Sequence, residues 1–233
     1  RLKADCPWLE LIVSVDWCQR HELLRLNIPL ASTAVRLAAD TSGRVIQRPA
    51  HPQTPPEQER WEVPAISWLA SQAKAPGGGI AVLLDGPQGV DGATDRLGVS
   101  LLRGATWPDP SADQGQQRMR LALMPFQGSW AHSAVPQAAI AFREPGWHGP
   151  IAAGQHQASM GTCCWLPAIP RRLCPIALRP DANGVVLQLL NPGASRCRWQ
   201  PGEGWKVGRS VAADDWVELA PGELVELRLA QSS

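Results

Sequence analysis

The densest group of residues with chemical potential lies in a polar loop, residues 101–118, between two strongly patterned segments. Loops held by rigid strands are where binding residues concentrate. Asp109, Asp113 and Gln114 could hydrogen-bond to sugar hydroxyls, Arg103 could orient a carboxylate, and Trp107 could offer an apolar face to a pyranose ring. The same Asp, Pro and Gly residues are also typical of turns, where they supply the backbone angles. The spacing alone leaves a substrate-binding rim and a plain turn both open.

Other residue types give weaker signals for chemistry. The five histidines (His21, His51, His132, His148, His156) show no metal-binding spacing with acidic neighbours, so we expect no metal site. The adjacent pair Cys163 and Cys164 is more typical of packing than of redox chemistry. The sequence has no nucleophile elbow, phosphate loop or dinucleotide fingerprint. We therefore expect no cofactor in this chain.

The chain contains eleven tryptophans and no tyrosine, and tryptophan faces can stack on sugars. Five of them lie in or beside expected strands, where we predict core packing: Trp8, Trp17, Trp61, Trp68 and Trp199. Three others lie in loop-like contexts and stay candidates for ligand contact: Trp107, Trp130 and Trp147.

The elements that must position this loop are mostly short strands. Alternating or continuous apolar patterns predict strands at residues 8–17, 24–30, 34–39, 60–63, 80–85, 96–103 and 117–124, then 185–190, 197–199, 205–207 and 223–229. We expect the first two strands to be antiparallel neighbours, and one helix at about residues 133–142. A Pro- and Gly-rich passage follows that helix. The sequence therefore predicts an all-β fold with one short helix, divided into a large sandwich at 1–158 and a small terminal β domain at 159–233.

Composition excludes several classes of partner. The 233 residues hold 22 Lys and Arg against 21 Asp and Glu, so there is no basic field to attract nucleic acid. The longest uncharged stretches contain Pro, Gln, His and Gly, which argues against a membrane span. No charged segment followed by an apolar run stands at the N-terminus, so we expect no signal peptide. The six cysteines are scattered without a framework, and we expect reduced thiols and a cytoplasmic location.

Several runs of the sequence resemble the C-terminal region of glycoside hydrolase family 38 α-mannosidases. They are residues 15–29, 45–51, 61–64, 79–85, 100–115 and 123–125, in the order and spacing of the family. The resemblance is specific from about residue 8 to 145 and looser through the final run at 221–229.

This resemblance implies a longer enzyme, with an N-terminal catalytic barrel-like domain and a helical segment before a large β-supersandwich and a smaller terminal β domain. The family's retaining chemistry uses a nucleophilic Asp, an acid/base Asp and a zinc ion held by His and Asp. Nothing in this sequence matches those motifs, so we assign no catalytic residue and no metal ligand. In the family a loop of the β domain reaches the catalytic cleft, and residues 106–115 are the best candidate for that loop here.

The sequence therefore favours a scaffold and cleft-rim fragment of a retaining α-mannosidase that hydrolyses terminal α-mannosides. Its partners would be the catalytic domain of the same polypeptide and a mannoside substrate, and we expect the fragment alone to be inactive. The alternative is a self-standing carbohydrate-binding or assembly module.

Overall fold

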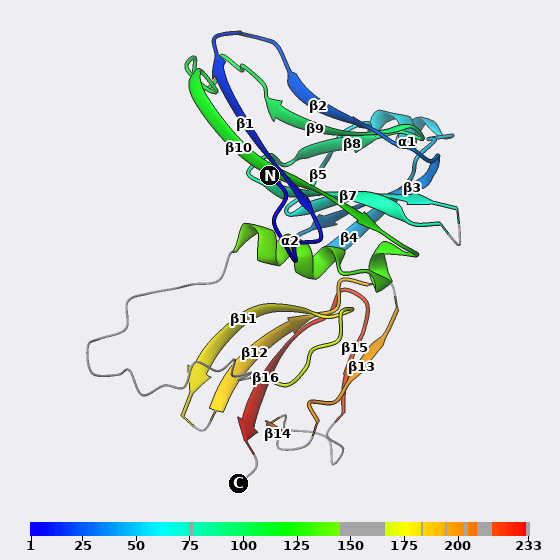
Figure 1. Ribbon diagram of the computed structural model, residues 1–233, viewed down its shortest axis with the longest axis vertical. Helices are drawn as coiled ribbons and strands as arrows, with labels where there is room; N and C mark the ends of the chain where they lie inside the picture. Colours follow the sequence, from blue (N-terminus) through cyan, green and yellow to red (C-terminus); the bar gives the residue numbers. More distant parts are fainter. Residues whose placement is uncertain are drawn as a thin grey trace, which may run out of the picture.

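The computed structural model describes residues 1–74, 77–144, 166–182, 184–193, 195–202, 205–208 and 216–231. Antiparallel strands make up most of it and form four sheets (Figure 1). This confirms the predicted all-β class. None of the helices in these ranges is long and apolar enough to cross a membrane.

Two sheets form the larger part of the molecule. The six-stranded sheet has the order β1, β10, β7, β6, β3, β4, with bounds Leu9–Trp17, Gly115–Phe126, Gly79–Asp85, Trp68–Ala73, Ala34–Thr41 and Arg44–Pro49. The four-stranded sheet has the order β2, β9, β8, β5, with bounds Leu24–Pro29, Arg96–Leu102, Gly89–Gly92 and Val63–Pro64.

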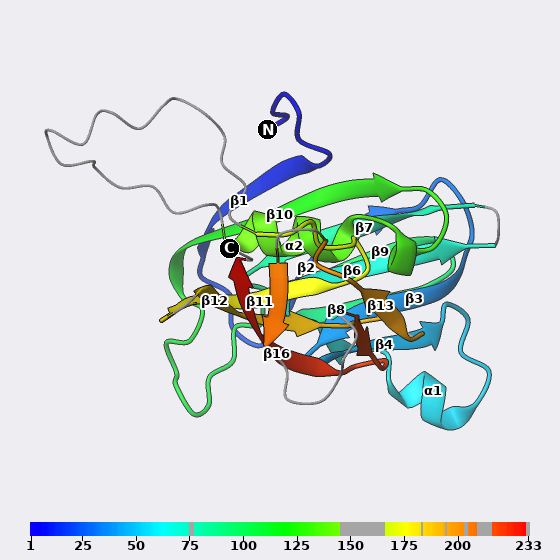
Figure 2. The same cartoon turned by 90° about the horizontal axis from the view of Figure 1, so that it is seen from below.

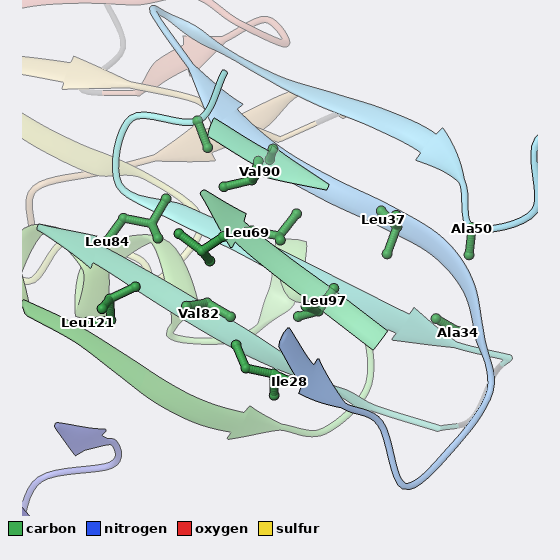
Figure 3. Close-up of a cluster of buried hydrophobic side chains, with 13 residues drawn as sticks. Ile28, Ala34, Leu37, Ala50, Leu69, Val82, Leu84, Val90, Leu97 and Leu121 are labelled. Atoms are coloured by element: carbon green, nitrogen blue, oxygen red, sulfur yellow. The ribbon is translucent and has the colours of Figure 1, made fainter. Parts of the chain in front are cut away.

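The two sheets pack face to face around one apolar core. Alternate residues of each strand point into this core, because successive side chains of a strand face opposite ways. Figure 3 shows Leu69, Val82 and Leu84 of the six-stranded sheet directed toward Ile28 and Leu97 of the other sheet. This part of the chain is therefore the predicted sandwich.

The opposite face of the six-stranded sheet is covered by α2, Val135–Arg143 (Figures 1 and 2). Val135, Ala139 and Phe142 of this helix are buried against that face. A short 3₁₀ turn, Trp130–His132, precedes the helix, and the ring of Trp130 lies 5.2 Å from that of Trp68. Because both faces of the sheet are covered, its central strands carry continuous apolar runs.

The terminal module is a second, smaller sandwich. One sheet has the order β11, β12, β16, β14, with bounds Cys174–Asp181, Gly184–Leu190, Leu224–Gln231 and Trp205–Gly208. The other pairs β13, Cys197–Trp199, with β15, Val217–Leu219. Leu187, Trp199 and Leu227 lie in its core. The predicted boundary between residues 158 and 159 lies outside the described residues.

Several element predictions were wrong or incomplete. Residues 9–17 and 24–29 are strands as predicted, but β1 pairs with β10 and β2 with β9, so the two lie in different sheets. Alternation identifies a half-buried strand but does not identify its partner. Of residues 60–63, predicted as a strand, only Val63 lies in one, at the start of β5. A second helix, α1 at Pro55–Glu59, precedes them, with a capping box between Thr54 and Glu57. Strands β4, β6, β8, β11 and β15 were not predicted.

Candidate functional site

Two connections between the sheets meet at one end of the large sandwich. Residues 18–23 run from β1 to β2, and residues 103–114 run from β9 to β10. Trp17 pairs with Gly115 in one sheet, and Leu24 pairs with Leu102 in the other. Both connections therefore cross between the sheets side by side, at the top of Figure 1.

Direct hydrogen bonds join the two connections. The backbone N–H of His21 donates to the Gly104 carbonyl at 2.8 Å, and the Gln114 side-chain amide donates to the Gln19 carbonyl at 2.8 Å. The His21 Nε2 atom lies 3.3 Å from the Thr106 hydroxyl. The longer loop is thus held against the shorter one at several points.

The two carboxylates of the longer loop are engaged within it. Asp113 has a positive φ of 63°, and its Oδ2 accepts hydrogen bonds from the backbone N–H groups of Arg103 at 2.8 Å and Gly104 at 3.1 Å. Asp109 Oδ1 accepts from the backbone N–H of Ser111 at 2.9 Å and from its hydroxyl at 2.7 Å. These bonds, the backbone one first, lower the pKa of Asp109.

An open cavity of about 810 Å³, here called the loop-end cavity, lies beside this loop. Arg103, Trp107 and Asp113 line it on the loop side, and Trp61 and Glu62 line it from the segment that precedes β5. Trp107 is 85% exposed. The cavity therefore combines charged groups with two indole rings that are accessible from solvent.

The structure brings together only part of the predicted set. Arg103, Trp107 and Asp113 line the same cavity. Asp109 and Gln114 belong to the same loop but do not line the cavity, and their polar groups bond to Ser111 and to Gln19. For these two residues the geometry favours the turn interpretation.

Sequence reasoning missed the opposite wall of the cavity. Trp61 was predicted to be core, but it is 57% exposed. Its neighbours Arg60 and Glu62 are charged, and this polar context was the signal that could have placed it on the surface. His21 and Glu22, from the shorter connection, also line the cavity and were not predicted.

Of the other tryptophan predictions, some are confirmed and one is wrong. Trp17, Trp68 and Trp199 are buried as predicted, and Trp8 packs against the core beneath α2. Trp130 was expected in a loop context that left it free for ligand contact, but it is 3% exposed and packs on Trp68. Trp147 lies outside the described residues.

A charge cluster lies on the outer face of the four-stranded sheet, beside Trp61. The buried carboxylate of Asp91 pairs with Arg25, and with Arg96 at 3.0 Å. The Arg25 guanidinium also lies 5.7 Å from the centre of the Trp61 ring, in cation–π range. A Cβ at Gly98 would overlap the Asp91 carboxylate, so a larger residue there would displace this ion pair. The ion pairs of this cluster hold the Arg25 side chain in place beside the Trp61 ring.

A metal ion has no evident site in the part of the chain that the structure describes, because no three His, Cys, Asp or Glu side chains gather there. These residues do not fit the zinc that the family resemblance implies for its catalytic domain. At the loop-end cavity, Glu62 accepts a hydrogen bond from Ser100, and Asp113 is bonded to the backbone. The arrangement is suited to hydrogen bonding and ring stacking with a ligand.

Comparison with known proteins gives consistent matches. Residues 1–111 match the family model described as "Glycosyl hydrolases family 38 C-terminal domain". Human alpha-mannosidase 2C1 is 31% identical over 144 residues, which are 62% of this chain and 14% of that protein. Alpha-mannosidase G of Dictyostelium discoideum is 29% identical over 122 residues, which are 52% of this chain and 11% of that protein.

Solved structures share the fold across nearly the whole chain. An alpha-mannosidase from Enterococcus faecalis V583 superposes with a TM-score of 0.72 at 17% identity, covering 96% of this chain and 27% of that one. A family 38 glycosyl hydrolase from Enterococcus faecalis gives 0.67 at 15% identity, covering 96% and 28%. The chain thus spans only about a seventh of the curated human relative and about a quarter of these structures. Residues 1–111 thus match the glycosyl hydrolase family 38 C-terminal domain, and the chain is similar to α-mannosidases in sequence and in fold.

Proposed function

We propose that this chain is the C-terminal β portion of a retaining α-mannosidase that hydrolyses terminal α-mannosides. In this proposal the chain supplies scaffold and one rim of the sugar cleft. The catalytic carboxylates and the zinc ion belong to an N-terminal catalytic domain of the same polypeptide. The names of the matched relatives and the small share of their length that the chain covers support this division of labour.

The loop-end cavity is the observation that carries the proposal. Trp107 projects from a loop that Asp113 and Gly104 hold in place, and Trp61 lines the other wall. The C–H face of a pyranose packs well on an indole ring, and its hydroxyls need polar partners nearby. Arg103 and Glu62 provide such partners. Because the loop is braced through its backbone, Trp107 can be preorganised for contact without a large ordering cost.

The test uses the complete polypeptide. If Trp107 contacts the substrate, Trp107→Ala should lower kcat/KM for an aryl α-mannoside by about tenfold or more, equivalent to roughly 1.4 kcal/mol. Its exposure predicts little change in the melting temperature. Trp216→Ala is the matched control, because Trp216 is 55% exposed and lies in the terminal module.

Unchanged kinetics in Trp107→Ala would contradict the cleft-rim role. The rival function, a carbohydrate-binding module, shares the same cavity and needs a separate measurement. Calorimetric titration of the 233-residue chain with methyl α-mannoside distinguishes the two. Binding that is lost in Trp107→Ala, together with wild-type kinetics in the complete polypeptide, would favour the rival.

The proposal includes a reducing, cytoplasmic setting. Cys6, Cys18, Cys174 and Cys197 carry free thiols, which supports it. Rapid alkylation of protein taken from its native host should modify all four after denaturation, and a disulfide at any of them would argue against this location.

A further inference from the structure

A second cavity, of about 500 Å³, lies on the other side of Trp61 and is here called the Arg48 cavity. It is bounded by β4, by the α1 segment that Figure 2 shows standing off the edge of the six-stranded sheet, and by β8. Three arginines line it: Arg48, Arg60 and Arg96. Only two carboxylates line it, those of Glu57 and Asp91.

Both carboxylates are already engaged. Asp91 pairs with Arg25 and Arg96, and its side chain is 6% exposed. Glu57 Oε2 accepts hydrogen bonds from the backbone N–H groups of Gln53 at 2.9 Å and Thr54 at 3.0 Å, as part of the α1 capping box. Among the described residues, Arg48 and Arg60 form no ion pair, so the cavity carries positive charge without a partner in this part of the chain.

The Arg48 guanidinium is fixed in place on one side only. Its Nη1 donates to the Arg60 carbonyl at 2.5 Å and to the Trp61 carbonyl at 3.3 Å. Its Nη2 is buried and meets no acceptor among the residues that the structure describes. Burial lowers the pKa of Arg48, and the nearby Asp91 only partly offsets this effect. A buried donor without a partner costs free energy.

We propose that the Arg48 cavity binds an oxyanion, the phosphate or carboxylate group of a small molecule, with the guanidinium groups of Arg48 and Arg60 as its cations. A guanidinium presents N–H groups in a planar fork that matches such anions. Pro52, Pro56 and Val63 give the cavity apolar walls beside the charges, which leaves room for the organic part of the ligand. This inference stands apart from the proposed sugar-cleft role, because its two cations, Arg48 and Arg60, do not line the loop-end cavity.

The test is calorimetric titration of the chain with inorganic phosphate and, separately, with citrate, each at ionic strength matched with sodium chloride. We expect saturable binding of at least one of them, with a Kd of about 10 mM or tighter. Arg48→Gln and Arg60→Gln should each weaken that binding by about tenfold or more. Stronger binding of phosphate would identify a phosphorylated ligand, and stronger binding of citrate a carboxylate.

Arg36→Gln is the matched control. Arg36 is exposed on β3, and strand alternation places it on the opposite face of the sheet from Arg48, whose backbone partner is Leu37. If Arg48→Gln fails to fold, Arg60→Gln still tests the proposal, because Arg60 is exposed and its replacement should leave the fold intact. The proposal is wrong if neither anion binds within that range. It is also wrong if Arg60→Gln binds as the Arg36→Gln control does.

Discussion

The two aspartates of the loop that follows β9 differ in what their carboxylates do. Asp109 bonds to Ser111, two residues ahead, and so stabilises its own turn. Asp113 reaches back ten residues to Arg103 and fixes the base of the loop. A change at Asp113 would therefore disturb the backbone as well as any ligand, and Trp107 is the cleaner probe of substrate contact.

Cys174 should make the stability of the chain depend on pH in the alkaline range. Burial, with a smaller contribution from Asp40, raises the pKa of this thiol from 9.0 to about 12. In the unfolded chain the thiol ionises near pH 9, while in the folded chain it stays neutral. The stabilisation is therefore complete below about pH 9 and is lost as the pH rises toward 12, by up to about 1.4 kcal/mol per pH unit.

Urea unfolding of Cys174→Ala between pH 8 and 11 measures this effect. The chain has no tyrosine, so fewer groups compete in this range. The slope of unfolding free energy against pH should be shallower in Cys174→Ala than in the wild type, and unchanged in Cys18→Ala, whose thiol is exposed. Equal slopes in all three proteins would contradict the assignment.

At the scale of elements, Gly104 is where the loop after β9 touches the loop after β1. Its φ is +57°, and a Cβ there would lie 2.8 Å from the Gln19 carbonyl oxygen and 3.2 Å from Trp17 Nε1. Gly43 has a similar φ of +76°, but a Cβ there would meet nothing within 4 Å. Comparing alanine variants at these two glycines therefore separates the free-energy cost of backbone strain from that of a steric clash.

We expect Gly43→Ala to lose about 1 kcal/mol of unfolding free energy from backbone preference alone. Gly104→Ala should lose about 1–3 kcal/mol more, because the two connections must also move apart. Denaturant titration measures both variants. If the two lose the same free energy, the contact between the connections is loose, and the loop-end cavity has no rigid wall.

Local patterns predicted most strands because alternation and apolar runs are properties of single segments. Strand β6 escaped prediction because Ser71 and Gln72 interrupt its apolar run, and β8 because it begins and ends with glycine. The pairing of β1 with β10 could not be predicted, since it joins segments that are about a hundred residues apart.

The candidate site shows the same limit. The polar loop was visible in the sequence, because Pro, Gly and Asp gather between two strands. Its opposite wall was not, because Trp61 meets the cavity only after β5 has paired with β8 at the edge of the four-stranded sheet. The prediction that Trp130 is free for ligand contact was wrong for the converse reason, since α2 and the sheet bury a residue that local sequence places in a loop.

At the scale of the whole molecule, α2 lies between the large sandwich and the terminal module (Figure 1). The Gln137 side chain on this helix donates hydrogen bonds to the carbonyls of Arg171 and, at 2.9 Å, Leu173. A cavity of about 580 Å³, lined by Trp130, Arg44 and Pro192 among others, separates other parts of the two modules. Their apolar cores are separate clusters.

Differential scanning calorimetry should therefore resolve two overlapping transitions, because each module has its own core and the contact between them is partly polar and open. Gln137→Ala should lower the transition temperature of the terminal module, with a loss of about 1–2 kcal/mol of its unfolding free energy. The unfolding free energy of the large sandwich should change by no more than about 0.5 kcal/mol. Gln58→Ala, an exposed change on α1, is the control. A single transition with equal calorimetric and van't Hoff enthalpies would show that the modules unfold as one unit.

Trp61 lines both the loop-end cavity and the Arg48 cavity, and its carbonyl accepts a hydrogen bond from Arg48. If both proposed sites bind ligands, a shift of this shared wall couples them, and the coupling is reciprocal. Any ligand that shifts this residue from one side changes the affinity of a ligand on the other side, and the factor is the same in both directions. Binding of a sugar in the loop-end cavity would therefore change the affinity of the Arg48 cavity for an anion through Trp61, and binding of the anion would change the affinity for the sugar.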